Sequence, residues 1–276
     1  MRWTATLAAF LPVLAAVSRA QEPAAVLLRL HPRVGDTLHM VLDQQTEVSV
    51  APVAGAAASA RPVRTAIAIH SQTIVRSVRG ASTVVLTIVD SVRLSSSDAH
   101  AAARAADTQR AFEGQQMELQ LGADGRVESA RDARGALVPR QVSDAMAAMP
   151  AVFPQKPVHV GEQWTRELAL PASGPLAGSG SGRAKATFRL DSLGRRGSTA
   201  FVSMRGDILP ESGGSAVALS GSIAGTMQLD RNRGWMTESR VLVTLESLVT
   251  PPLASGLAPT RFLTRVTQHL STMDKR

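Results

Sequence analysis

Apolar and polar residues alternate along most of this chain, and this alternation constrains its fold more than any other feature of the sequence. In the run of residues 37–50, for example, Leu38, Met40 and Leu42 share one parity. Successive side chains of a β-strand point to opposite faces, so a period of two predicts a strand with one buried face. We therefore expect a protein built mainly from antiparallel β-strands.

Runs of the same kind recur along the chain, and short turn sequences separate them. The predicted strands cover residues 37–50, 65–78, 83–94, 117–121, 126–130, 164–170, 186–190, 200–204, 227–229, 235–245 and 262–270. Gly80 and Gly125 lie in two of the turns, where glycine can adopt the positive φ that tight hairpins require. Residues 51–64 and 171–182 are rich in small residues and do not alternate, so we predict mobile loops there.

Two segments have features of short helices instead. Residues 99–112 are rich in alanine, follow Asp98 as a candidate N-cap and end before Gly114. Residues 140–149 show helical spacing of apolar side chains and end at Pro150. We expect helices in both places.

The stretch from Phe153 to Trp164 separates two similar series of predicted strands. Val160-Gly161-Glu162 precedes one strand in the way that Val34-Gly35-Asp36 precedes another. Later turns and strands of the two series also correspond, with insertions between them. The similarity suggests two pseudo-repeated halves within one protein.

We therefore predict an α+β fold, predominantly antiparallel β, with short helices and a curved sheet or partly closed barrel. The first half covers residues 21–152, the second covers residues 153–276, and we expect the two halves to share one sheet. The alternative is a pair of separate β-sandwiches.

The N-terminus has the features of a cleaved signal peptide, which would cover residues 1–20. Arg2 precedes an apolar run from Ala5 to Val17, and Ser18 and Ala20 are the small residues that a signal peptidase reads. The run is shorter than the roughly 20 apolar residues that cross a bilayer. We expect cleavage after Ala20, export to the periplasm or the medium, and no transmembrane segment in the mature chain.

Composition narrows the classes of function. The chain contains no cysteine, which excludes disulfides, thiolate metal sites and lipid attachment through a cysteine. The net charge is +8, but the basic residues are spread along the chain without a block of like charge, so we expect no nucleic-acid partner. With 3% aromatic residues and no tyrosine, the core must consist of aliphatic side chains, alanine and methionine.

Motifs for catalysis or metal binding are not found in the sequence. The six histidines do not have the spacing of a zinc site; they are His31, His39, His70, His100, His159 and His269. The glycine-rich run 178–182 fits neither a phosphate-binding loop nor a nucleophile elbow. We predict no catalytic residue, no metal and no cofactor.

Four aromatic residues are the candidate ligand-binding residues: Trp164, Phe188, Phe201 and Trp235. The two indoles begin predicted strands, and the four rings could together line an apolar cavity. The simpler interpretation is that they fill the core of the second half, which large aromatic side chains usually do.

Pro154, Lys156-Pro157-Val158, Val160-Gly161 and Trp164 resemble the centre of a family of exported bacterial proteins that is known only as a domain of unknown function. Glu162 departs from the aspartate of that pattern. The resemblance implies an envelope protein without an assigned activity, so it assigns no site residue. The predicted architecture is also similar to the half-barrels of periplasmic lipoprotein carriers, which concerns the fold alone.

These observations favour a non-enzymatic envelope protein whose concave sheet face binds an apolar small molecule, a lipid or another envelope component. A hydrolase with dispersed active-site residues is one alternative. A structural interaction module is the other. The oligomeric state does not follow from the sequence.

Overall fold

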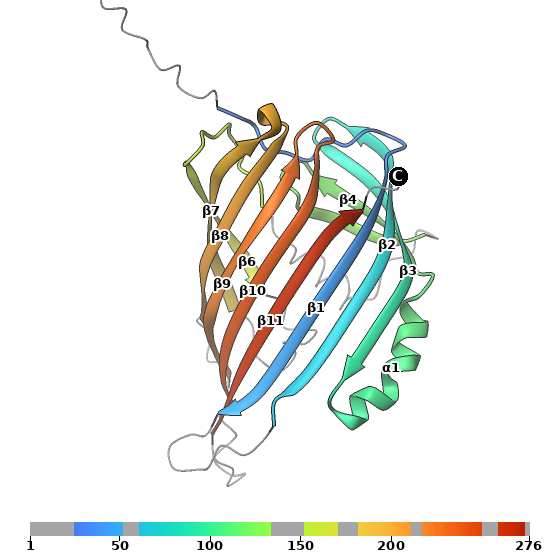
Figure 1. Cartoon of the computed structure of the whole chain (residues 1–276), viewed down its shortest axis with the longest axis vertical. Helices are drawn as coiled ribbons and strands as arrows, with labels where there is room; N and C mark the ends of the chain where they lie inside the picture. Colours follow the sequence, from blue (N-terminus) through green and yellow to red (C-terminus); the bar gives the residue numbers. More distant parts are fainter. Residues whose placement is uncertain are drawn as a thin grey trace, which may run out of the picture.

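Eleven strands form one antiparallel sheet that is strongly curved and open (Figure 1). The computed structural model describes residues 25–51, 61–133, 152–170, 182–210, 217–249 and 259–273. The spatial order of the strands is β5-β4-β3-β2-β1-β11-β10-β9-β8-β7-β6. A single sheet confirms the predicted fold class and excludes two separate sandwiches. The division of the chain at residue 153 stays a prediction.

The strands have the following bounds: β1 (Thr37–Ala51), β2 (Val63–Arg79), β3 (Ser82–Ser96), β4 (Gln116–Gly122), β5 (Val127–Asp132), β6 (Gln163–Leu170), β7 (Gly182–Gly194), β8 (Thr199–Pro210), β9 (Val217–Asp230), β10 (Trp235–Val249) and β11 (Thr260–Met273). Each predicted strand lies within one of them, except that the predicted run 126–130 begins one residue before β5. β9 is longer than predicted, because it begins at Val217. The predicted loops 51–64 and 171–182 fall mostly outside the described residues, but Val63 already belongs to β2.

Neighbours in the sheet are neighbours in the chain, with one exception. β1 pairs with β11 along nearly their whole lengths, from His39 opposite Met273 to Ala51 opposite Arg261. This pairing joins the first five strands to the last six in the middle of the sheet. β5 and β6 are therefore the two edges.

Helix α1 (Ala99–Phe112) lies beside β3 (Figure 1) and confirms the first predicted helix. The Asp98 carboxylate accepts a hydrogen bond from the amide of Ala101, as an N-cap should. β4 pairs with β3 only as far as Ile88. Past that point, the Gln109 amide donates to the carbonyl of Leu94, and the Glu113 carboxylate accepts from the amide of Val92. These contacts satisfy backbone groups of β3 that would otherwise form a bare edge. The second predicted helix, residues 140–149, lies outside the described residues.

Three glycines allow the sheet to curve at β8 and β9. Gly206 of β8 lies opposite Ile223, and Gly221 and Gly225 flank Ile223 on β9. A Cβ atom at any of the three would lie within 3.0 Å of the backbone of the neighbouring strand. Only glycine permits such close approach, and glycine kinks of this kind bend a sheet.

Two buried clusters lie on the concave face. The larger one consists of Val26, Leu28, Phe153, Val158, Ala184, Ala186, Phe188, Leu190, Ala200, Val202, Met204, Ile208, Leu219, Met227, Leu229 and Leu245. The smaller one consists of Leu38, Val75, Val85, Leu121, Val127 and Trp235. Leu30 packs against both clusters, so the two sides of the curved sheet meet around the N-terminal segment.

The N-terminal segment, residues 25–31, crosses one end of the concave face. Val26 forms an antiparallel bridge with Val158 just before β6. The amide of Leu30 donates to the carbonyl of Ala123 in the β4–β5 turn, and the amide of His31 donates to the carbonyl of Gly234 in the β9–β10 turn. The segment thus ties together turns from both sides of the sheet.

A second segment, residues 152–158, crosses the same end. The amides of Val152 and Phe153 both donate to the carbonyl of Asp124 in the β4–β5 turn. The Trp164 indole N–H donates to the carbonyl of Val152 over 2.8 Å. The two edges of the sheet are therefore connected at this end through residues 152–158 instead of through a strand pair.

Two turns that the sequence matches have the same hydrogen bonds. In residues 33–36 the Asp36 carboxylate accepts from the amide of Arg33, and in residues 159–162 the Glu162 carboxylate accepts from the amide of His159. Gly35 and Gly161 both have a φ of 90°, a conformation that side chains disfavour. The replacement of aspartate by glutamate therefore leaves this turn geometry unchanged.

Candidate functional site

The concave face between the two clusters is the candidate site. Residues that are opposite each other in an antiparallel pair share a face, so Leu42 shares this face with Ile69 and Leu270. The aliphatic side chains of the central strands on this face are Met40, Leu42, Val48, Ile67, Ile69, Val241, Val243, Val266 and Leu270. All of them are only half-buried. The described segments 25–31 and 152–158 cover one end of the face. Val241 and Val243 pack against the larger cluster and Met40 against the smaller one, and the remaining side chains belong to neither.

Charge is distributed unequally between the two faces. All side chains on the concave side of the five central strands are uncharged. These strands are β1, β2 from Val63 to Val75, β11, β10 from Ser239 and β9 from Leu219. On the convex side of the same strands lie Glu47, Arg64, Arg265 and Glu246, and the Arg64 Nε atom is 3.0 Å from a Glu47 oxygen. The concave side of these five strands is therefore uncharged, and their convex side carries the charged residues. At the edge of the sheet, Arg166 of β6 lies on the concave side, and its guanidinium donates to the carbonyl of Phe153.

Neutral polar side chains occupy the middle of this uncharged surface. Gln44 of β1 lies directly opposite Gln268 of β11, and the Gln44 Nε2 atom is 3.4 Å from the Thr46 hydroxyl. On the same face, Thr46 is the next concave residue after Gln44, and Thr264 lies diagonally across from Thr46, opposite Val48; the two threonines are 6% and 5% exposed. These four side chains, Gln44, Thr46, Thr264 and Gln268, are called the central polar group below.

The structure brings together two of the four predicted ligand-binding residues. Trp164 and Phe188 lie opposite each other on β6 and β7, and their rings stack with centroids 5.7 Å apart at 12°. Phe188 is fully buried, and Trp164 is half-buried at the rim of the larger cluster.

The other two predicted residues lie elsewhere. Trp235 belongs to the smaller cluster, across the concave face from Phe188. Phe201 lies opposite Ser192 on the convex face, and its ring covers Gly194 so closely that a Cβ atom there would lie within 3.0 Å of it. An aromatic ring that covers a glycine of a neighbouring strand in this way stabilises the sheet. The four rings do not line one cavity.

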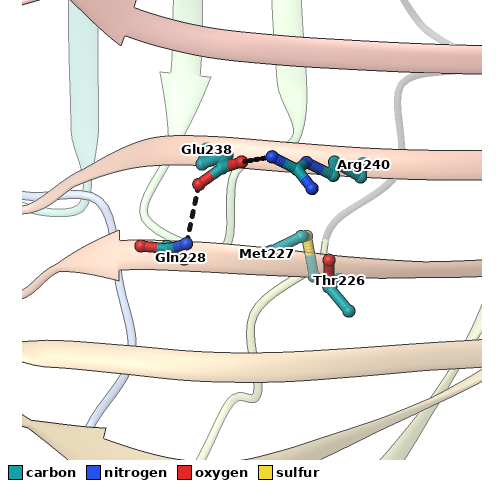
Figure 2. A pocket seen from close by; sticks show the side chains of 5 residues that line it. All are labelled: Thr226, Met227, Gln228, Glu238 and Arg240. Atoms are coloured by element: carbon teal, nitrogen blue, oxygen red, sulfur yellow. Dashed lines mark hydrogen bonds and ion pairs between the residues drawn. The ribbon is translucent and has the colours of Figure 1, made fainter.

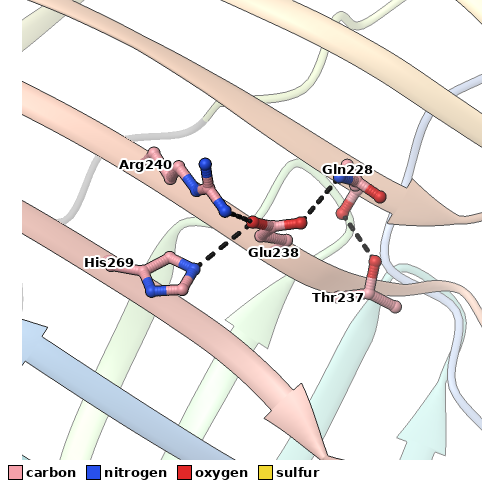
Figure 3. Close-up of polar contacts among 5 residues, drawn as sticks. All are labelled: Gln228, Thr237, Glu238, Arg240 and His269. Carbon is pink, nitrogen blue, oxygen red and sulfur yellow. Dashed lines mark hydrogen bonds and ion pairs between the residues drawn. The ribbon is translucent and has the colours of Figure 1, made fainter.

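A polar network joins three strands on the convex face (Figure 3). Glu238 of β10 accepts a hydrogen bond from the Gln228 amide over 2.7 Å and pairs with Arg240 at 2.8 Å. The His269 Nε2 atom lies 3.3 Å from the same carboxylate. The Thr237 hydroxyl donates to the backbone carbonyl of Gln228 and therefore does not point at His269. The network links β9, β10 and β11 as cross-strand pairs do.

Two small pockets adjoin this network. Thr226, Met227, Gln228, Glu238 and Arg240 line a pocket of about 150 Å³ (Figure 2). A second pocket, of about 300 Å³, lies near the β7–β8 and β9–β10 turns and shares Gln228. Both are at or below the roughly 300 Å³ lower limit of typical ligand sites, and charged side chains line both. The concave side of the central strands, in contrast, carries no charged side chain.

Among the described residues, no group of three or more His, Asp or Glu side chains is arranged to hold a metal ion. No helix in the same part of the chain is both long enough and apolar enough to cross a membrane.

Comparison with known proteins agrees with a protein of unassigned activity. Residues 136–236 match the model of a family of unknown function, DUF6263. That range includes the stretch from Phe153 to Trp164. None of the curated proteins compared with the chain matches it.

Two solved structures are similar in part. One is a structure titled for lipid–protein interactions in lipovitellin, with 9% identity and a TM-score of 0.46 over 88% of this chain. The chain spans only 26% of that protein's length. The other is the COG4313 outer membrane channel from Pseudomonas putida F1, with 10% identity and a TM-score of 0.25, covering 88% of this chain and 97% of the channel.

Sequence analysis predicted a binding face on the concave side of the sheet, but it named only aromatic residues for it and missed the central polar group. The signal that could have found it is the parity of the long strands. On β1 and β11 the apolar parity is also the parity of Gln44 and Gln268, while every charge has the opposite parity.

Proposed function

We propose that this protein is an exported, non-enzymatic protein that binds a lipid or another apolar molecule along its concave face. The observation that carries the proposal is the uncharged concave surface, on which a row of aliphatic side chains across β2, β1, β11 and β10 is half-exposed. Contiguous apolar patches on protein surfaces usually mark binding sites.

The physical argument follows from the free energy of apolar burial. Removing apolar surface from water contributes about 25 cal/mol per Å², so an acyl chain lying along several strands would gain substantially. The glycines Gly206, Gly221 and Gly225 bend the sheet before any ligand arrives, which reduces the ordering cost of binding. The segments 25–31 and 152–158 close one end, so a long apolar molecule would lie with one end against Val26 and Val152.

Leu42→Gln is expected to weaken binding of a fluorescent acyl probe by about tenfold, since losing the apolar contact of one leucine costs about 1.5 kcal/mol. Glutamine fits this face, because Gln44 already occupies the next concave position of β1. The measurement is a fluorescence titration of the purified protein with the probe.

Val41→Gln is the matched control for this titration. Val41 precedes Leu42 on β1, faces the convex side opposite His70 and is also half-buried. The control should bind the probe as the wild type does. If both variants lose affinity equally, or if the wild type does not bind the probe, the concave face is not the binding site.

Export is tested separately by intact mass. We expect the exported protein to begin at Gln21, because Ser18 and Ala20 are suited to signal peptidase. A mature protein that retains Met1 would contradict export through cleavage.

A further inference from the structure

The central polar group is the most informative feature of the concave face that the proposed function leaves unused. Hydrophobic binding alone would be served best by aliphatic side chains at every concave position. Instead Gln44 and Gln268 lie opposite each other where β1 and β11 join the two series of strands. Thr46 lies one concave position beyond Gln44 on β1, and Thr264 lies two concave positions beyond Gln268 on β11, past Val266.

We propose that the ligand is an uncharged lipid with an ester, amide or hydroxyl group, and that Gln44 and Gln268 hydrogen-bond this group in the middle of the concave face. This inference rests on the proposed function, because it names the class of molecule that the concave face binds. It distinguishes a neutral lipid from a fatty acid anion and from a pure hydrocarbon.

The charge distribution disfavours an anionic ligand. A carboxylate that leaves water without a cationic partner loses a large hydration free energy. The concave positions of the five central strands supply no lysine or arginine, because arginines of these strands such as Arg64 and Arg265 lie on the convex face. Arg166 lies on the concave side of the edge strand β6, away from the central polar group, and its guanidinium already donates to the carbonyl of Phe153. A fatty acid anion would therefore lie against the central polar group without an ion pair.

The same group disfavours a ligand without polar atoms. A carboxamide offers two N–H donors and one carbonyl acceptor. The contact with Thr46 occupies one donor of Gln44, and Gln268 has no hydrogen-bond partner among the described residues. A hydrocarbon chain would cover these groups and leave them without water or a partner, which costs about 1–3 kcal/mol for each group. An ester carbonyl accepts from an amide, and a hydroxyl can donate as well as accept.

Competition against a fluorescent monoacylglycerol probe tests the inference, with monoolein, oleate and 1-octadecene as competitors below their aggregation limits at pH 8. We expect the wild type to bind monoolein at least about tenfold more tightly than either of the others, since one unsatisfied polar group corresponds to about that ratio. Equal affinity for monoolein and oleate would overturn the inference.

Two pairs of variants locate the preference. Gln44→Leu should reduce the preference for monoolein over 1-octadecene by about tenfold, and Gln45→Leu should leave it unchanged, because Gln45 is the adjacent residue on the convex face opposite Thr267. Gln268→Lys should reverse the preference in favour of oleate by supplying a cation. Thr267→Lys adds the same charge to the convex face and should leave the preference unchanged.

The outcomes separate this inference from the proposed function. If the wild type binds none of the three competitors nor the probe, the proposed function itself fails. If it binds all three alike and Gln44→Leu behaves as Gln45→Leu does, the concave face binds apolar molecules without reading a polar group, and only the inference fails. Circular dichroism of each variant verifies that the sheet is retained. Loss of structure would weaken the binding of every competitor, so it cannot produce the reversed preference for oleate that is expected of Gln268→Lys.

Discussion

Gly221→Ala is expected to lower the free energy of unfolding by about 3 kcal/mol, although the change adds only one methyl group. The new Cβ atom would lie within 3.0 Å of the Thr244 carbonyl oxygen, and this atom belongs to the backbone of β10. A flexible side chain could move away, but a backbone group that is paired along a whole strand cannot. The measurement is a urea denaturation curve followed by circular dichroism.

Ser222→Ala is the matched control, since it places the same side chain on the next residue of β9. Ser222 is exposed on the convex face opposite Asp207 and Thr244, where there is room for a methyl group. The control should change the midpoint little, as most surface substitutions do. If Gly221→Ala also keeps the wild-type midpoint, β9 and β10 do not approach so closely, and the bend at β9 has another cause.

The same glycines explain why the sequence predicted β9 incompletely. Along most strands, large apolar residues mark one parity, and for this reason the predicted run 37–50 matches β1 almost residue for residue. Between Val217 and Gly225 that parity contains Gly221 and Gly225, and serines flank Gly221 on both sides. Where the backbones of neighbouring strands approach most closely, glycine occupies concave positions in place of a large apolar residue. The alternation that identifies a strand is therefore absent from this part of the sequence.

The N-terminal segment shows the opposite case, an alternation without a strand. Val26, Leu28 and Leu30 share one parity and face the core, but the structure gives this segment a single bridge, between Val26 and Val158. Its other backbone bonds reach two different turns, at Ala123 and Gly234. Alternation reports that one side of a segment is buried, and it does not report whether a neighbouring strand is available for pairing.

The sequence predicts which face of the sheet an aromatic side chain lies on, but it does not predict which of the two clusters the side chain joins. Parity along β8 places Phe201 opposite to Val202 and Met204, so the sequence already contained the fact that Phe201 faces away from the core. The placement of Trp235 in the smaller cluster, apart from Phe188, depends on the curvature of the whole sheet. Curvature arises from contacts between strands, and no local pattern in the sequence encodes it directly.

Phe188→Ala is expected to cost about 3–5 kcal/mol, the range for deleting a buried phenylalanine ring. Phe188 is fully buried, stacks on Trp164 and lies opposite Met204 on β8. The cost includes the cavity that remains, because the neighbouring strands hold their side chains in place. Thr187→Ala on the convex side of β7 is the control and should change stability by much less.

The shape of the unfolding curve carries as much information as its midpoint. Domains usually have about 5–15 kcal/mol of stability, so losing 3–5 kcal/mol should shift the urea midpoint clearly. Because β1 pairs with β11, and Leu30 packs against both clusters, damage at Phe188 should destabilise all eleven strands together in one transition. A curve in which only part of the β-signal is lost early would show that the series β1–β5 and β6–β11 unfold independently. In that case the pairing of β1 with β11 contributes little to cooperativity, and residues 21–152 and 153–276 are separate domains.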